Sequence, residues 1–167
     1  MGLQGAVGEE PSREYQLKAA VLYKFTHYIE WEGSAYHPNS PTSICVVGRD
    51  PFQGVLQDLV RIKDPDFRRT VIEYPKTAGE LRKCRLVFLS RAKEPDIDRF
   101  IEATRSFTAV TVSDIPGFAH RGGIIELIVE GDSIRFIINQ AKARDLGIRL
   151  SSQLLALARE LITEGQE

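Results

Sequence analysis

Short, mainly apolar runs separated by helical patterns are the feature that most limits the fold of this chain. Three such runs lie at 44–48, 84–89 and 109–112, and the first is rich in β-branched residues, which is typical of a strand covered on both faces. Between them, residues 50–52 combine a capping Asp with an early Pro and predict a helix start, and a second helix is predicted over about 94–105. The chain therefore predicts repeated βαβ units with parallel strands.

The second half of the chain predicts antiparallel pairing. The runs 124–129 and 134–138 flank a turn rich in residues that tolerate positive φ, so they predict a hairpin. Residues 71–74 predict an edge strand that stops at Pro75, and 77–81 can form one helical turn. We therefore expect an α/β fold: one mixed sheet of about six strands with helices on both faces, in which βαβ units precede a hairpin.

Helical periodicity predicts the first element of the domain. Apolar residues recur at steps of four, four and three from Leu17 to Tyr28, so a largely buried helix should begin near Tyr15 and end near Trp31. The residues 33–41 that follow are rich in Ser, Asn and Pro and predict a loop.

Two further helices are predicted near the C-terminus. One runs from Gln140 to about Leu146 with Gly147 as its C-cap, and Ser151 begins the last one. The residues of the last helix that should pack inward are Leu154, Leu155, Leu157, Ala158 and Leu161.

Length, charge and hydropathy narrow the classes of function. The 167 residues include 22 basic and 23 acidic side chains, which gives a formal net charge of -1. Because the two signs are interspersed, there is no sustained positive field to attract nucleic acid or anionic lipid, and no apolar stretch of about 18 residues predicts membrane insertion. We expect a flexible leader over 1–12, one domain over 13–163 and a tail over 164–167.

No stretch of the sequence has the quality of a catalytic or metal-binding motif. The loop 48–52 lies where a nucleotide-binding fold holds phosphate, but it lacks GxGxxG and GxxxxGK, and Asp50 adds a negative charge there. Ser113, Asp114 and His120 could form a hydrolytic triad only with a GxSxG turn, which is missing. The two cysteines and three histidines have none of the short spacings of zinc sites. We therefore expect no catalytic residue, no metal and no cofactor.

One loop and one group of aromatic residues could bind a partner or a ligand. The loop 117–123 combines flexible glycine backbone with Phe118, His120 and Arg121, which are side chains that commonly anchor protein partners. A plain glycine loop that leads into the hairpin is the alternative. The aromatic residues beside the first helix, which could line an apolar pocket or simply fill the core, are Tyr23, Tyr28 and Trp31.

Six motifs occur in an order that is typical of one family. They are Tyr15–Ala20 with Tyr23–Phe25 and Trp31; Cys45–Phe52; Cys84–Leu89; Gly117–Phe118 with Gly122–Ile125; Ile134–Asn139; and Leu150–Leu155. Together they cover about 14–160, and in these motifs the chain resembles the YfiR family.

The resemblance implies a periplasmic α/β regulator without catalytic activity. The best-known member of that family represses a membrane-bound diguanylate cyclase by binding its periplasmic sensor region, which lowers cyclic-di-GMP output. A homodimer is implied as well, and because members carry a secretion signal, we expect that one has been removed ahead of the short leader. A small-ligand sensor of the periplasm is the alternative function, and a Rossmann-like enzyme is a more distant one.

The cysteines Cys45 and Cys84 lie near the beginnings of strands that a βαβ unit would place side by side. This topology leaves two possibilities open, a disulfide or two free cysteines that act as small apolar side chains. The resemblance, with the periplasmic location that it implies, favours the disulfide. The best-known member also has a second cysteine pair in its C-terminal part, and residues 141–167 contain no cysteine, so we expect no redox switching through such a pair.

Overall fold

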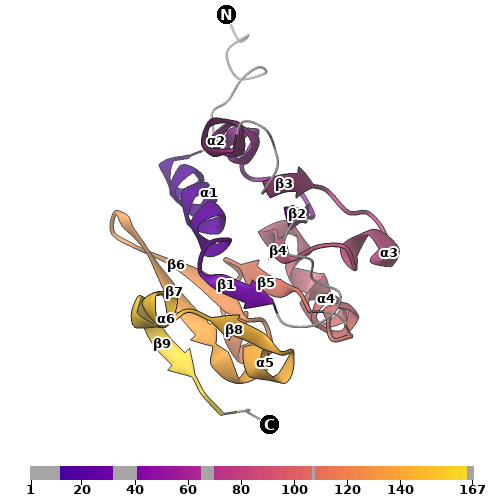
Figure 1. Cartoon of the computed structure of the whole chain (residues 1–167), viewed down its shortest axis with the longest axis vertical. Coiled ribbons are helices and arrows are strands. Elements are labelled where there is room, and N and C mark those ends of the chain that lie inside the picture. Colours follow the sequence, from indigo (N-terminus) through magenta and orange to yellow (C-terminus); the bar gives the residue numbers. More distant parts are fainter. Residues whose placement is uncertain (1–11, 32–40, 65–69, 107, 165–167) are drawn as a thin grey trace, which may run out of the picture.

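The computed structural model describes residues 12–31, 41–64, 70–106 and 108–164. Its main sheet contains seven strands: β2 (Thr42–Val47), β3 (Thr70–Glu73), β4 (Leu86–Leu89), β5 (Val110–Ser113), β6 (Ile125–Glu130), β7 (Ser133–Asn139) and β9 (Ala158–Ile162). Their order across the sheet is β3-β2-β4-β5-β6-β7-β9 (Figure 1). Neighbours are parallel from β3 to β6, β7 runs antiparallel to β6, and β9 runs parallel to β7.

This sheet confirms the predicted fold class, with βαβ units followed by a hairpin. The central strand β4 explains why the two faces carry different helices. Leu86 and Phe88 point into a core shared with α1 (Arg13–Phe25) and α2 (Val55–Lys63), while Val87 and Leu89 point into a second core with α3 (Ala78–Leu81) and α4 (Ile97–Thr104). All four side chains are buried, as expected of a strand covered on both faces.

The prediction of one helix from Tyr15 to Trp31 is wrong at its C-terminal end. The helix α1 stops at Phe25, and Ile29–Trp31 forms the short strand β1, which pairs antiparallel with β8 (Ile148–Leu150) in a separate two-stranded sheet. Ile29 and Trp31 are buried while the intervening residue is exposed, which is the alternation of a strand. The predicted loop over 33–41 lies almost wholly outside the described residues.

The prediction of a long last helix is also wrong. Ser151 caps a helix as expected, but α6 ends after five residues (Ser152–Ala156), and the strand β9 follows. Leu157 is 56% exposed and Leu161 is 40% exposed, so neither packs inward. Pairing with the free edge of β7 overrides the local helical pattern here, because local propensity is weak beside tertiary hydrogen bonding. The sheet therefore has seven strands instead of about six.

Two other helices begin later than the sequence suggests. The backbone N–H of Phe52 donates to Asp50 Oδ1 at 2.8 Å, which makes a capped turn, and α2 begins only at Val55 after Gly54 with φ +88°. A 3-10 turn over Arg91–Asp96 precedes α4 in the same way. The helix α5 (Gln140–Asp145) ends as predicted beside Gly147, whose φ is +71°.

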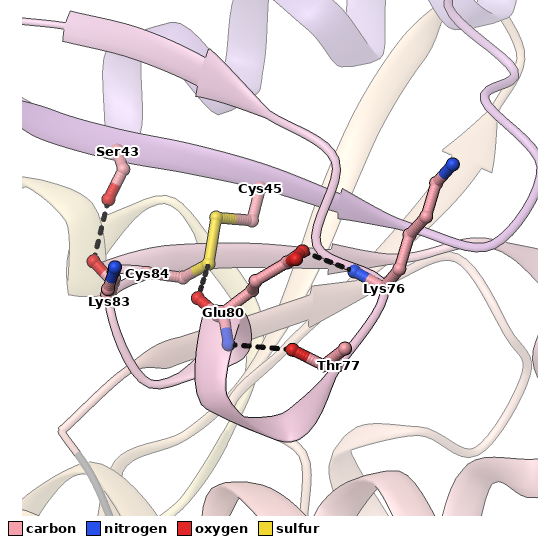
Figure 2. The surroundings of a disulfide bond; sticks show 7 residues. All are labelled: Ser43, Cys45, Lys76, Thr77, Glu80, Lys83 and Cys84. Carbon is pink, nitrogen blue, oxygen red and sulfur yellow. Dashed lines mark hydrogen bonds between the residues drawn. A yellow bond between two sulfur atoms is a disulfide. The ribbon is translucent and has the colours of Figure 1, made fainter.

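A disulfide joins Cys45 in β2 to Cys84, which precedes β4 (Figure 2). The two Cα atoms are 5.9 Å apart, the residues are separated by 39 positions, and both side chains are buried. Close by, Ser43 Oγ donates to the Lys83 carbonyl at 2.9 Å. The bond that the resemblance favours is thus present, and it holds the connection between α3 and β4 against the sheet.

The replacement Cys45→Ala/Cys84→Ala should lower the free energy of unfolding by up to about 4 kcal/mol, because it opens a loop of 39 residues and raises the entropy of the unfolded chain. Denaturant unfolding measures this loss. Dithiothreitol should lower the stability of the wild type and leave that of the double variant unchanged. Two free thiols in unreduced protein, detected by alkylation and mass spectrometry, would contradict the bond.

Candidate functional site

The loop 117–123 does not present its aromatic residue to solvent, so the expectation that Phe118 anchors a partner is wrong. Phe118 is fully buried in the core that contains Val87 and Phe100. A Cβ placed on Gly123 would lie 2.1 Å from Cε2 of the Phe118 ring. The glycine is therefore required because the ring packs directly against its backbone, and it does not mark a flexible binding loop.

His120 and Arg121 do lie at the surface, on the 3-10 turn η2 (Ala119–Arg121). His120 Nε2 lies 2.8 Å from Glu160 Oε2 on β9, and Arg121 Nη2 donates to Asp98 Oδ1 on α4 at 2.9 Å. Both pairs are partly exposed. Such pairs add little stability and are open to exchange with the charges of a partner.

The strand β9 forms one free edge of the main sheet and lies beside η2. Among the backbone hydrogen bonds between described residues, none joins β9 to a strand other than β7. Leu161 of β9 is exposed, and so is Leu157, the residue just before the strand. We call the surface formed by Leu157, Arg159, Glu160, Leu161 and His120 the β9 edge.

A second cluster, at the carboxyl ends of the parallel strands, was missed by the search for motifs. Asp114 follows β5, is buried, and accepts hydrogen bonds on Oδ2 from Lys18 Nζ at 2.8 Å and from the Tyr15 hydroxyl at 2.7 Å. Lys18 is fully buried and also bonds Glu14, while Arg91 Nε lies 3.5 Å from Asp114 Oδ1. The sequence signals were Tyr15 and Lys18 at helical spacing and Asp114, which the sequence suggested only as a member of a hydrolytic triad.

This cluster attaches the first helix to the sheet. Burial, reinforced by the hydrogen bond to the Asp114 carboxylate, raises the pKa of Tyr15 well above its usual range, so the phenol stays protonated and donates. Ser113 Oγ donates to the Leu89 carbonyl, and His120 pairs with Glu160. The three residues of the conceivable hydrolytic triad therefore each have a different partner.

Other candidate positions have structural roles. Gly48 packs against the turn after β4, since a Cβ there would lie 2.8 Å from Lys93 Cγ, and Asp50 caps the following turn. Trp31 is buried in the main core and Tyr28 packs against it. Within the described residues, no group of three or more His, Cys, Asp or Glu is placed to hold a metal ion, and no helix is long and apolar enough to cross a membrane.

The sequence pattern of a family described as YfiR/HmsC-like matches residues 15–159. The chain belongs to this family. This confirms the resemblance seen in the six motifs, and the family is known for periplasmic regulators of diguanylate cyclases. No curated protein matches the chain in sequence.

The chain is also similar in fold to a solved structure, a conserved domain protein from Vibrio cholerae O1 biovar El Tor strain N16961. The TM-score is 0.58 with 13% sequence identity, and the match covers 88% of this chain and 60% of that chain. At this identity the similarity extends to the fold alone.

Replacing Asp114 by Ala should lower the free energy of unfolding by about 3–5 kcal/mol, because the buried Lys18 ammonium loses its buried counter-ion. The double variant Lys18→Met/Asp114→Ala should recover part of that loss. Asp98→Ala is the control, since Asp98 pairs with Arg121 at the surface, and it should change stability by less than about 1 kcal/mol. Equal losses in Asp114→Ala and Asp98→Ala, measured by denaturant unfolding, would rule out this role.

Replacing Gly123 by Ala should lower stability by about 1–3 kcal/mol, because the added methyl group overlaps the buried Phe118 ring. Gly79→Ala in α3 is the matched control: nothing lies closer than 3.9 Å to its new Cβ, and the change should be neutral or slightly stabilising. Thermal unfolding of both variants compares them directly. An unaltered melting temperature in Gly123→Ala would mean that the ring is free to move.

Proposed function

We propose that the protein is a non-enzymatic periplasmic regulator that binds the periplasmic sensor region of a membrane-bound diguanylate cyclase and represses it, which lowers cyclic-di-GMP output. Membership of the YfiR/HmsC-like family supports the periplasmic, regulatory part of this proposal. The observation that carries the binding part is the free β9 edge, where exposed Leu157 and Leu161 lie beside charged side chains.

Several properties of the β9 edge suit it to protein binding. An edge strand offers unpaired N–H and C=O groups to a segment of a partner, and neighbouring apolar side chains add buried area on association. The opposite edge strand, β3, has only four residues, and Pro75 follows soon after it. Both features disfavour pairing of an edge strand with another chain. His120 contacts Glu160 of β9, and Arg121 follows it and lines a hollow together with Ile162 of β9, so both can supply charges that orient a partner. A homodimer is the oligomeric state that we expect for the free protein.

The test compares repression by the full chain with repression by variants of the β9 edge and of the neighbouring Arg121. The protein is co-expressed in the periplasm with its full-length cyclase, and cellular cyclic-di-GMP is measured. Leu157→Asp/Leu161→Asp should raise cyclic-di-GMP towards the level of the cyclase alone, because it adds two negative charges to the apolar part of the contact. Arg121→Glu, tested separately, should do the same because it reverses the charge of an exposed side chain. Both changes fall on exposed side chains, so melting temperatures should change by only a few degrees.

Ile62→Asp is the matched control, because Ile62 is a 75% exposed apolar residue on α2, at the end of the molecule away from β9 (Figure 1). It should repress like the wild type. Full repression by Leu157→Asp/Leu161→Asp would move the contact to another surface. Failure of the wild-type protein to bind or repress the cyclase, or nucleotide turnover that survives repurification, would overturn the function itself.

A further inference from the structure

A cavity of about 290 Å³ lies between α3 and α4 at the carboxyl ends of β2 and β4. Its floor is apolar and is formed by Leu81, Leu89 and Phe100, all buried, together with Val47. This volume is just below the range of about 300–1,000 Å³ that is usual for ligand pockets, so only a small molecule would fit. None of the residues proposed above to contact the cyclase lines it.

The rim of this cavity is cationic. Lys76, Lys93 and Arg99 line it against the single carboxylate of Asp96, and the side chains of the three cations make no ion pair with a described residue. In a partly enclosed site, unpaired cations above an apolar floor favour a ligand with one negative group and an apolar body.

The strand order gives an independent reason to expect a ligand here. From β2 the chain passes to β3 on one side and then to β4 on the other, and α2 and α3 lie on opposite faces of the sheet. Such a reversal opens a crevice outside the carboxyl ends of the two strands, which is where open α/β sheets bind ligands. Val47 and Leu89, the last residues of β2 and β4, both line the cavity.

The wall that α3 contributes is held in place before any ligand arrives. Figure 2 shows Thr77 Oγ1 accepting from the Glu80 N–H at 3.1 Å and the Glu80 carboxylate accepting from the Lys76 N–H at 2.8 Å. The disulfide at Cys84 fixes the other end of this turn to β2. A preformed wall lowers the entropic cost of binding.

We propose that this cavity binds a small monoanionic carboxylate with an aromatic or short aliphatic body. The carboxylate contacts Lys93 and Arg99, and the apolar body contacts Leu81 and Phe100. This proposal is independent of the β9 edge and of the cyclase, so binding measurements on the purified protein are sufficient to test it.

The test is a titration of the full chain with phenylacetate and hexanoate, monitored by NMR and by calorimetry. The neutral amides of the two acids are the controls. Saturable shifts of the Ala78 and Ala103 resonances are expected with the acids, since both residues line the cavity. The amides should bind about tenfold more weakly or worse, because they lack the charge that Lys93 and Arg99 attract.

Two variants and one matched control locate the site. Lys93→Met/Arg99→Met should weaken acid binding about tenfold or more, and Ala103→Trp should abolish it by filling the cavity. Arg105→Met removes an exposed cation just beyond α4, outside the cavity, and should leave binding unchanged. The proposal is overturned if neither acid binds saturably, if acids and amides bind alike, if Ala103→Trp binds as the wild type does, or if Arg105→Met loses as much affinity as the double variant.

Discussion

Coverage of β4 on both faces is the constraint on which the rest of the structure depends. Leu86 and Phe88 require an apolar layer on one side and Val87 and Leu89 require another on the other side. The chain meets both demands by packing α1 and α2 on one face and α3 and α4 on the other. The segments that follow β3 and β4 lie together beside the carboxyl ends of β2 and β4.

The two ends of the sheet are consequently unlike. The parallel half around β2 and β4 is closed by a disulfide and contains a cavity with a rigid wall. The other half ends in a hairpin and the edge strand β9, where Leu161 and the preceding Leu157 are exposed. The two proposals place a small molecule in the first half and a protein segment at the edge of the second, so they concern separate surfaces of one domain.

Sequence reasoning succeeded where the signal was local and failed where the partner was distant. The sequence predicted β2, β4, β5 and the β6–β7 hairpin correctly, because in each case the apolar pattern and the turn residues that mark the element are close together in the chain. By contrast, β1 and β9 are short strands that form because they pair with β8 and β7. The sequence around each of them does not reveal these partners, so the prediction missed both strands. Lys18 meets Asp114 across 96 positions, and only packing reveals that Gly123 leaves room for Phe118. Strand topology alone left open whether Cys45 and Cys84 form a disulfide or stay free, and only the family resemblance favoured the disulfide.

The complete enclosure of Lys18 makes its amine a natural reporter of motion. An acylating reagent dissolved in water cannot reach the nitrogen while α1 lies on the sheet, because the side chain has no exposed surface. Labelling of Lys18 therefore proceeds only through openings that lift the helix, and its rate, set against that of the exposed Lys24 on the same helix, measures how often they occur. The labelling rate of this one lysine thus reports how often α1 detaches in the native protein, without any substitution in the chain.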